Sequence, residues 1–597
     1  MASEDVRGKM RQVNLALDLD KTRRKLDDAV EHFVTEDPTP GVVVGLVFDG
    51  ELVHAASAGT TTIGQQRAPG IDTVFRIASM TKSFTAATTL SLRDQGRLGL
   101  DDPVVSWLPW FTDTTAEGVP LTVRHVLTMG GGFATDDPWG DRQQDLPLEA
   151  FDRLATEGFS TVWTRGTRYE YSNLGYALLG RVLSVVTGEA FDELVSRLLL
   201  RPLSLESTTF HAPEDGRLAQ GYALDDGQPV PEPVAGYGAF APMGGLFSTV
   251  RDLARWVQGY IDAERLVAGS HPLSAASRRE MSQTHRLIGA EATQEHAAAA
   301  VRVSASGYGF GLEESLYDGI GRVVSHSGGY PGFGSHMRWH PASGLAVIGL
   351  GNRTYSPMRR LVGSLLDEVV RTTPAVPASV SPTTESAVQS VEELVTAWDD
   401  ERAVRLFADN VVVDEALASR HAHIDRVVDA VGPLRHVEAP SRSDSPAHRA
   451  WTMAGDRGVA QLEVLMSPHS VPLITWLAVT AVPQPSARLV SVATAVVAEM
   501  NSECPTMPAQ WPDGLVVDDG LDAASVTAQL RSGSARMGTV RLGDPVRNVS
   551  KAGTTTVAWQ ILGEHGRAEL QLAVSDAGTV SALTLRFAPI TTAEEQT

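Results

Sequence analysis

Cysteine, lysine and long apolar runs are scarce in this chain of 597 residues. The single cysteine, Cys504, excludes an internal disulfide and a zinc site built from cysteines. No apolar run approaches the ~18 residues that a membrane span requires. Residues 1–11 are charged and polar where a signal peptide would be apolar. We therefore expect a cytoplasmic protein with no membrane partner, stabilised by its hydrophobic cores alone.

Positive charge is also in deficit. Lys and Arg number 50 against 72 Asp and Glu, which gives a net charge of −22 at pH 7. Nucleic acids and anionic membranes bind clustered basic surfaces through counterion release, so this balance argues against a polyanionic partner. With 43% hydrophobic and 20% charged residues, the composition is typical of a folded protein.

The first domain is predicted to extend over residues 1–372 with an α+β fold. Two apolar runs around Asp49-Gly50 predict a β-hairpin in residues 41–56. Helical spacing follows from 79 to 96 and from 148 to 187, and strands return at 322–325, 335–340 and 344–350. A sheet built from both ends of a domain, with helices inserted between them, is an α+β arrangement.

A linker and a repeated pair of small domains are expected after this domain. The Pro-, Ser- and Thr-rich segment at 373–386 predicts the linker. Residues 407–414 (FADNVVVD) match 511–518 (WPDGLVVD) at an offset of 104 residues. We therefore expect tandem α+β domains over 387–483 and 484–597, each with helices before strands. They are similar to cystatin-like or nuclear-transport-factor-like units, and helices expected at 391–397 and 418–431 argue against C-terminal β-barrels.

Ser79-Met-Thr-Lys82 is the first candidate for chemistry. If the segment from Met80 is helical, Ser79 stands at the helix start and Lys82 lies one turn on, on the same face. The amine can then take the hydroxyl proton, and the helix N-terminus favours the developing negative charge. Taken alone, the motif also fits a helix-capping serine ahead of an exposed lysine.

Lysine usage strengthens this candidate. Only five of the 50 basic residues are lysines, and one of them is Lys82. An arginine stays protonated, whereas a desolvated lysine can lose its proton and act as a base.

Two further motifs carry polar groups. Tyr171-Ser-Asn173 precedes an apolar helix, where the phenol beside an ammonium could shift toward phenolate and the amide could orient Lys82. His326-Ser-Gly328 ends an apolar strand. A packed tyrosine, a capping asparagine and a chance histidine are the simpler interpretations of each motif taken alone.

Together, these motifs resemble those of the serine β-lactamase and penicillin-binding-protein superfamily, in the class C-like branch that includes esterases and D-aminopeptidases. The resemblance extends over residues 24–372. It rests on four blocks: 75–82 (FRIASMTK), 121–128 (LTVRHVLT), 244–253 (GGLFSTVRDL) and 326–332 (HSGGYPG).

The resemblance implies a role for each matched residue and no metal or other cofactor. Ser79 is the acyl-accepting nucleophile and Lys82 helps to deprotonate it. Tyr171 relays protons, and Asn173 holds Lys82 and the substrate. The remaining matched residues are His326, which takes the strand position of a lysine in relatives; Gly328, which binds substrate; and Ser79 and Gly329, whose backbone N–H groups form the oxyanion hole.

The departures from the family pattern shape the expected substrate. His-Ser-Gly in place of Lys-Thr-Gly removes a fixed positive charge, which favours an ester, short amide or peptide over a β-lactam. The loop at 133–145 is expected to shape the pocket. Acyl transfer or peptide cyclisation by the same acyl-enzyme, and a catalytically silent binding or sensor protein, remain alternatives. The oligomeric state stays open.

Two other sites are disfavoured. No Gly-x-Ser-x-Gly elbow of an α/β-hydrolase is found. His421 and His423 lie two apart in an expected helix, so they point to different faces and are not expected to bind one metal.

Overall fold

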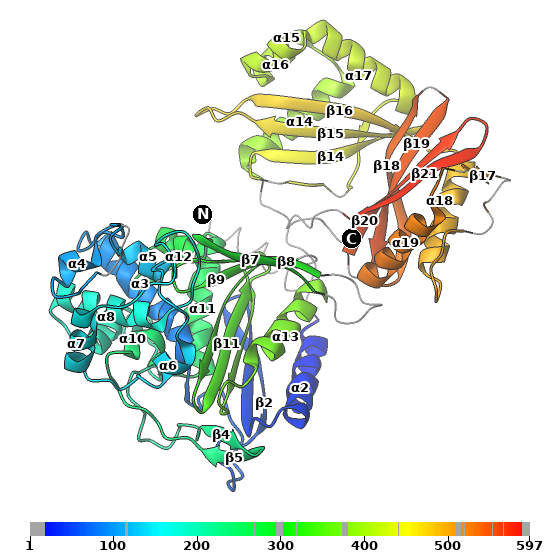
Figure 1. Ribbon diagram of the computed structural model, residues 1–597. Coiled ribbons are helices and arrows are strands. Elements are labelled where there is room, and N and C mark those ends of the chain that lie inside the picture. Colours follow the sequence, from blue (N-terminus) through cyan, green and yellow to red (C-terminus); the bar gives the residue numbers. More distant parts are fainter. Residues whose placement is uncertain are drawn as a thin grey trace. The chain divides into compact units, whose positions relative to one another are not determined.

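The computed structural model separates the chain into two compact units (Figure 1). The first comprises residues 1–291 and 303–373, and the second comprises residues 374–597 together with 292–302. The structure describes residues 18–113, 118–267, 269–293, 302–317, 320–372, 380–439, 441–443, 445–508, 511, 515–518, 520–551, 553–564 and 566–587.

An eight-stranded antiparallel sheet forms the centre of the first unit. Its order is β2-β1-β12-β11-β10-β9-β8-β7, so the N-terminal hairpin pairs with strands that come more than 280 residues later. This confirms the α+β fold expected from the sequence. The strands are β1 (Gly41–Phe48), β2 (Glu51–Gly59), β7 (Arg286–Thr293), β8 (Arg302–Tyr308), β9 (Glu313–Tyr317), β10 (Gly321–Tyr330), β11 (Phe333–His340) and β12 (Leu345–Gly351).

The hairpin follows directly from its turn residues. Asp49 and Gly50 both have positive φ angles, 49° and 87°, which a two-residue hairpin turn of the primed type requires. Every residue of β1 is buried, because helices cover both faces of the sheet at this strand.

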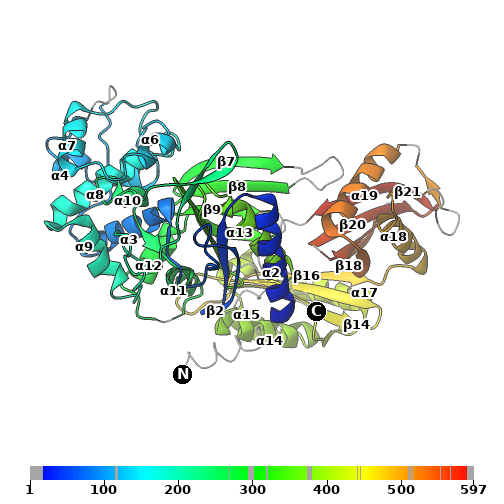
Figure 2. The same cartoon turned by 90° about the horizontal axis from the view of Figure 1, so that it is seen from below.

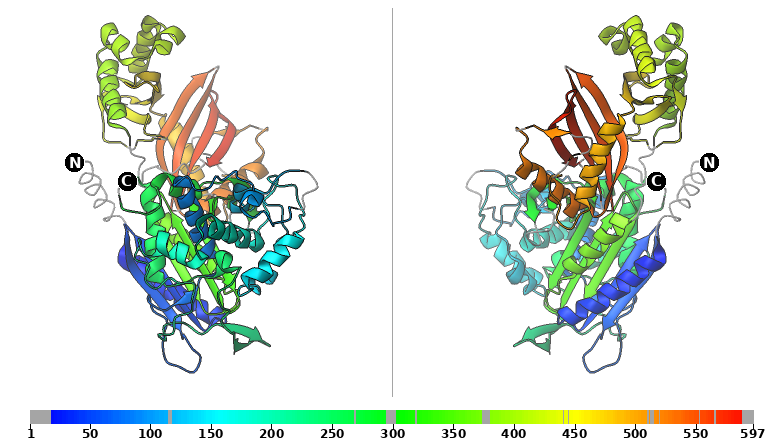
Figure 3. Two further views of the ribbon diagram at one scale, coloured as in Figure 1. Left: turned by 90° about the vertical axis from the view of Figure 1, so that its left-hand side faces the viewer. Right: turned by 90° about the vertical axis from the view of Figure 1, so that its right-hand side faces the viewer.

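Two helices cover one face of the sheet. Helices α2 (Leu19–Glu36) and α13 (Met358–Thr372) lie across the strands, as the right panel of Figure 3 shows. Leu26, Val30 and Leu366 from these helices pack with Val42 and Val44 of β1 to form a separate core. The larger core lies on the opposite face.

The helical block covers that opposite face and carries most of the candidate site. Within it, α8 is buried from Asn173 to Gly180, as its apolar sequence predicts. This unit also contains two small two-stranded sheets, β3 (Phe75–Arg76) with β6 (Phe247–Ser248) and β4 (Tyr222–Asp225) with β5 (Gln228–Pro231). The helices are α3 (Thr81–Asp94), α4 (Val104–Trp107), α5 (Val123–Leu127), α6 (Asp137–Asp141), α7 (Leu148–Glu157), α8 (Asn173–Thr187), α9 (Phe191–Val195), α10 (Ala241–Gly244), α11 (Val250–Glu264) and α12 (Ala275–Met281), with a 3-10 turn η1 (Ala78–Met80) and a π-helical turn η2 (Ser196–Leu200).

Among the described residues, no single helix has both the length and the apolar character to cross a membrane. One bent pair, Asn173–Thr187 followed by Phe191–Leu200, meets the length and composition test only when its two parts are taken together. The first part belongs to the buried core described above.

The second unit contains two small domains, each with helices packed on its own antiparallel or mixed sheet. In the first small domain, α14 (Pro382–Thr396), α15 (Asp400–Leu406), α16 (Asp409–Asp414) and α17 (Leu417–Val431) precede the sheet β13-β14-β15-β16. These strands are β13 (Arg435–His436), β14 (His448–Gly455), β15 (Gly458–Met466) and β16 (Ile474–Pro483). Both helices expected from the sequence in this domain are present.

In the second small domain, the short strand β17 falls between two helices, and the other four strands follow them. Helices α18 (Ala487–Met500) and α19 (Ala523–Met537) pack against the sheet β17-β21-β20-β19-β18 (Figure 2). Its strands are β17 (Val516–Val517), β18 (Val540–Lys551), β19 (Thr554–Gly563), β20 (Gly566–Ser575) and β21 (Thr579–Phe587).

Two details of the sequence interpretation are wrong. Residues 382–386, assigned to the linker, form the start of α14, because Ser381 caps the helix by accepting the Thr384 N–H; residues 373–379 lie outside the described residues. The matched stretches 407–414 and 511–518 also differ: the first contains helix α16, whereas the second contains strand β17. Similar residues there form different elements, and the expected order of helices before strands holds in the second domain only for β18 to β21, because β17 precedes α19.

Candidate active site

Ser79 lies at a strained junction between strand and helix. It sits in η1, which runs directly into α3. Ala78, just before it, has a φ of +48°, a left-handed conformation that costs a non-glycine residue roughly 1–2 kcal/mol. This sharp turn places a buried Ser79 hydroxyl against the helical block.

Lys82 contacts Ser79, as the spacing predicts. Its Nζ lies 3.0 Å from Ser79 Oγ, 2.6 Å from Asn173 Oδ1 and 2.9 Å from the carbonyl oxygen of Met243 in α10. The side chain is fully buried. All three protons of the ammonium therefore have an acceptor.

Burial determines the charge balance of Lys82. Desolvation lowers the pKa of Lys82 to about 8, although the carboxylates of Asp137, Asp141 and Asp136 act in the opposite direction. Near neutral pH, part of the population thus carries an unprotonated amine, which a surface lysine does not.

Tyr171 lies over the same ammonium. The centre of its ring is 4.8 Å from Lys82 Nζ. Burial raises the pKa of Tyr171 well above its usual value, with Asp137 acting in the same direction and a hydrogen bond from Ser79 opposing it. The expected shift toward phenolate is therefore wrong: desolvation outweighs the neighbouring ammonium, and Tyr171 stays a neutral phenol.

Asn173 is held by two aspartates. Ser172 caps α8 by accepting the Gly175 N–H, which fixes where the helix begins. The N–H of Asn173 donates to Asp136 Oδ1 at 2.7 Å, and its side-chain Nδ2 donates to Asp137 Oδ1 at 2.9 Å. The amide oxygen is then left facing Lys82.

His326 is buried on β10 and is neutral. Its Nδ1 lies 2.6 Å from the carbonyl oxygen of Ser327, so Nδ1 carries the proton and Nε2 accepts from the Tyr308 hydroxyl at 3.1 Å. Burial, reinforced by Lys82, lowers the pKa of His326 to about 3. This residue brings no positive charge to the site.

Strand β10 lies directly against the turn that carries Ser79. A Cβ at Gly328 would stand 2.3 Å from the carbonyl oxygen of Ile77, so only glycine fits this contact. Ser335 on β11 donates to the same carbonyl at 2.8 Å. The N–H groups of Ser79 and Gly329 remain the predicted oxyanion hole.

A family model described as Beta-lactamase matches residues 26–370, more than half of the chain. The chain belongs to this beta-lactamase family. One relative is penicillin-binding protein 4 of Amycolatopsis lactamdurans, which is 30% identical over 53% of this chain and 82% of that protein. Another is the D-alanyl-D-alanine-carboxypeptidase/endopeptidase AmpH of Escherichia coli K12, which is 27% identical over 40% of this chain and 62% of that protein.

A solved structure that the comparison matched to this chain is the octameric penicillin-binding protein homologue from Pyrococcus abyssi. It is 19% identical, with a TM-score of 0.49, over 94% of this chain and 98% of that one.

Sequence reasoning missed the acidic residues that surround Lys82 in this beta-lactamase family member. The loop at 133–145 was expected only to shape a pocket, yet it carries Asp136, Asp137 and Asp141. Burial raises the pKa of Asp141 to about 6, and its Oδ2 accepts from the Tyr355 hydroxyl at 2.6 Å. The Asp136-Asp137 pair ahead of Pro138 was the available signal, but nothing local shows that it reaches Lys82.

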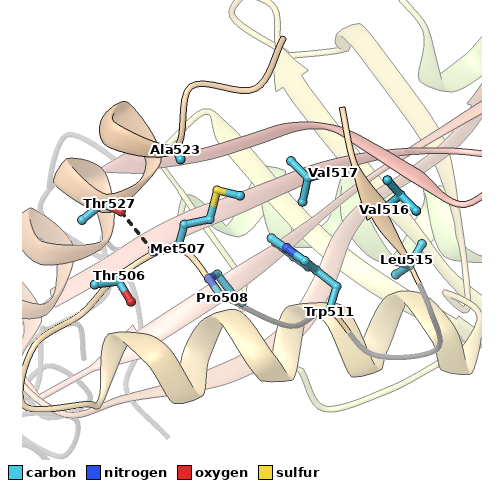
Figure 4. Close-up of a pocket in the computed structure, with 9 residues that line it drawn as sticks. All are labelled: Thr506, Met507, Pro508, Trp511, Leu515, Val516, Val517, Ala523 and Thr527. Carbon is cyan, nitrogen blue, oxygen red and sulfur yellow. Dashed lines mark hydrogen bonds between the residues drawn. The ribbon is translucent and has the colours of Figure 1, made fainter. Parts of the chain in front are cut away.

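Other parts of the chain were searched for further candidate sites. In the part of the chain that the structure describes, no cluster of His, Cys, Asp or Glu could hold a metal ion. His421 stacks on Trp398, whereas His423 contacts the carbonyl oxygen of Val479, so the two rings diverge as expected. A cavity of about 720 Å³ lies in the second small domain, lined by Thr506, Met507, Pro508, Trp511, Leu515, Val516, Val517, Ala523 and Thr527 (Figure 4).

Proposed function

We propose that this beta-lactamase family member is a serine hydrolase that forms an acyl-enzyme on Ser79 and cleaves an ester or a short amide or peptide bond. The observation that supports it is the 3.0 Å contact between Ser79 Oγ and the fully buried Lys82 Nζ. A surface serine and lysine would be solvated separately and would gain nothing from this proximity.

Lys82 acts as the base in the first step. In its unprotonated form, the amine takes the proton as Ser79 Oγ attacks the substrate carbonyl carbon. The ammonium that results donates to Asn173 Oδ1 and to the Met243 carbonyl, both already in place. Two of the three ammonium donors therefore keep their acceptors, and the third faces Ser79 Oγ.

Tyr171 relays the proton onward. As a neutral phenol over Lys82, it gives its proton to the leaving alcohol or amine and regains one from the Lys82 ammonium, while the bond between acyl carbon and leaving group breaks. In deacylation the same groups take a proton from water as its oxygen attacks the acyl carbon. They return this proton to Ser79 Oγ as the bond between Oγ and the acyl carbon breaks. N–H groups of Ser79 and Gly329 would stabilise the oxyanion by about 3–4 kcal/mol per donor.

The neutral His326 favours substrates without a carboxylate at that position. A fixed cation beside the strand would stabilise an anionic substrate, and burial of His326 prevents one there. AmpH is named for D-alanyl-D-alanine carboxypeptidase activity, and a peptide substrate that ends in D-Ala carries a C-terminal carboxylate. We infer that esters and uncharged short amides are turned over faster here than acyl-D-Ala-D-Ala peptides or nitrocefin.

Covalent labelling tests the nucleophile. A fluorophosphonate probe should add to the wild-type chain, and Ser79→Ala should abolish the adduct in intact-protein mass spectra. Ser91→Ala, a serine near the C-terminal end of the same helix α3, is the matched control and should label normally. An undiminished adduct on Ser79→Ala would remove Ser79 from the mechanism, and an unreactive wild type would favour a catalytically silent protein.

The substrate class is tested by a panel of p-nitrophenyl esters, D- and L-aminoacyl anilides, acyl-D-Ala-D-Ala and nitrocefin. Products are compared with and without an added amine. Free acid as the main product supports hydrolysis, whereas an amide of the added amine supports the acyl-transfer alternative.

A further inference from the structure

The orientation of the Asn173 amide decides how Lys82 is held. Its oxygen and nitrogen have similar size, so packing alone does not select which of them faces Lys82. With Oδ1 toward Nζ, as observed at 2.6 Å, the amide accepts a proton from the ammonium. If the amide were rotated by 180°, two donors would face each other and the ammonium would lose an acceptor.

Asp137 selects that orientation. A carboxylate only accepts hydrogen bonds, so the amide group that faces it must be Nδ2, which lies 2.9 Å from Asp137 Oδ1. The neighbouring Asp136 accepts the N–H groups of Asn173 and Leu174 at 2.7 and 2.8 Å, which fixes the backbone of the same residue. One aspartate thus holds the main chain and the other holds the side chain.

Close packing of α6 on α8 keeps Asp137 beside Asn173. A Cβ at Gly140 in α6 would lie 2.8 Å from Asn173 Cβ, so α6 approaches α8 as closely as a glycine allows. Asp137, the first residue of α6, cannot move away from Asn173 without breaking this contact.

We propose that Asp137 is a positioning residue: its carboxylate fixes the Asn173 amide so that Oδ1 holds the Lys82 ammonium formed when Ser79 is deprotonated. The inference rests on the proposed function of Ser79 and Lys82. It assigns to the segment at 133–145, which contains α6, a part in the proton transfer that the sequence did not indicate.

Asp137 also sets the charge state of Lys82. The titratable groups that face Lys82 are Asp136, Asp137 and Asp141 from α6 and the residue before it, Tyr171 and Tyr176 at α8, and His326 from β10. Among the carboxylates, Asp137 has the largest effect and raises the pKa of Lys82 against the desolvation that lowers it. Removing the charge should therefore lower that pKa further.

The test is the rate of Ser79 labelling by a fluorophosphonate, measured against pH for the full-length chain. Wild-type labelling should rise with pH to a plateau, with its midpoint near the Lys82 pKa of about 8. Asp137→Asn retains an acceptor oxygen for Nδ2 but no charge, so its midpoint should move to lower pH with the plateau kept. A shift of half a unit would make labelling at pH 6.5 about threefold faster than in the wild type.

Asp137→Ala removes both the charge and the acceptor. Its plateau should fall by about 10- to 100-fold because the amide can rotate away. Asp152→Asn is the matched control: Asp152 lies on α7 and pairs with Arg181 of α8 at 2.8 Å, so neither its midpoint nor its plateau should change. Circular dichroism verifies that each variant is folded.

Three outcomes overturn the inference. They are an Asp137→Asn midpoint equal to that of the wild type, an Asp137→Ala plateau equal to that of the wild type, and equal losses in both variants without a shift of the midpoint. If Asp137→Ala does not fold, the Asp137→Asn midpoint decides alone. A wild type with no adduct on Ser79 would instead reject the proposed function, so the two failures are distinguishable.

Discussion

Lys82 is the residue on which the proposed chemistry depends most directly. It is fully buried, bonded to three acceptors and placed 3.0 Å from Ser79 Oγ. A buried cation costs free energy, which the chain compensates with three carboxylates near it. A residue with only a structural role would be replaced by an apolar side chain at lower cost.

Lys82→Arg should reduce p-nitrophenyl ester turnover by about 10²- to 10⁴-fold. The guanidinium keeps the positive charge but cannot release its proton at neutral pH, so Ser79 has no base. Lys25→Arg is the matched control, because Lys25 pairs with Glu368 on α13, away from Ser79, and Arg can make the same pair. Near wild-type turnover of Lys82→Arg would contradict the role of Lys82 as the base.

The contact between Ser79 and Lys82 could be predicted from the sequence, whereas the protonation states of the other site residues could not. Ser79 and Lys82 are three residues apart in a helical segment, so their contact is local and is observed. The neutral states of His326 and Tyr171 depend on how much protein surrounds them, and that protein comes from elements far away in the chain.

At the scale of elements, the contact between β10 and η1 joins the two halves of the site. Gly328 lies where a Cβ would meet the Ile77 carbonyl oxygen at 2.3 Å and Ala78 Cβ at 3.1 Å. The glycine is needed for space, because the strand must approach the backbone of the nucleophile turn.

Gly328→Ala should therefore separate β10 from η1. We expect ester turnover to fall by about 100-fold through misplacement of the site, with a loss of about 1–3 kcal/mol of stability from overpacking. Gly70→Ala is the matched control, since no atom lies within 4 Å of the added Cβ. Turnover and thermal unfolding are measured on both variants. Unchanged turnover of Gly328→Ala would refute this account of the contact.

Elements with strong local signals were predicted well. The hairpin at Asp49-Gly50 depends on two adjacent residues, and α8 depends on an apolar run behind a capping serine. The matched stretches in the small domains were not, because α16 and β17 form from similar residues in different surroundings. Short amphipathic segments take the form that their neighbours can pair with.

At the scale of the whole molecule, buried histidines make the first unit sensitive to acid. Burial lowers the pKa of His326 to about 3 and those of His271 and His340 to about 4, and it lowers that of His336 well below its usual range. The folded unit binds fewer protons than the unfolded chain between the ordinary histidine pKa of about 6.5 and these values. The contribution of these histidines to its stability is therefore fully present above pH 6.5 and is lost as the pH falls.

The free energy of unfolding of this unit should be lower at pH 5 than at pH 7.5, by about 1–2 kcal/mol for each buried histidine. Asp136 and Asp141, whose pKa values are raised, offset part of the loss in acid. Denaturant unfolding followed by circular dichroism measures the difference. His271→Asn should reduce this difference in unfolding free energy by the contribution of one histidine, about 1–2 kcal/mol. Equal free energies of unfolding at the two pH values would contradict the prediction.

From the sequence alone, we could infer the hairpin at Asp49-Gly50, the apolar helix α8, membership of the beta-lactamase family and the contact of Ser79 with Lys82. Each of these follows from the spacing of nearby residues or from motifs that can be recognised in the sequence alone. Three features depend instead on contacts between distant segments: Asp136 and Asp137 bond to Asn173, β10 packs against η1, and burial removes the charge from His326. Desolvation and charge coupling act through space, so they depend on which distant segments meet.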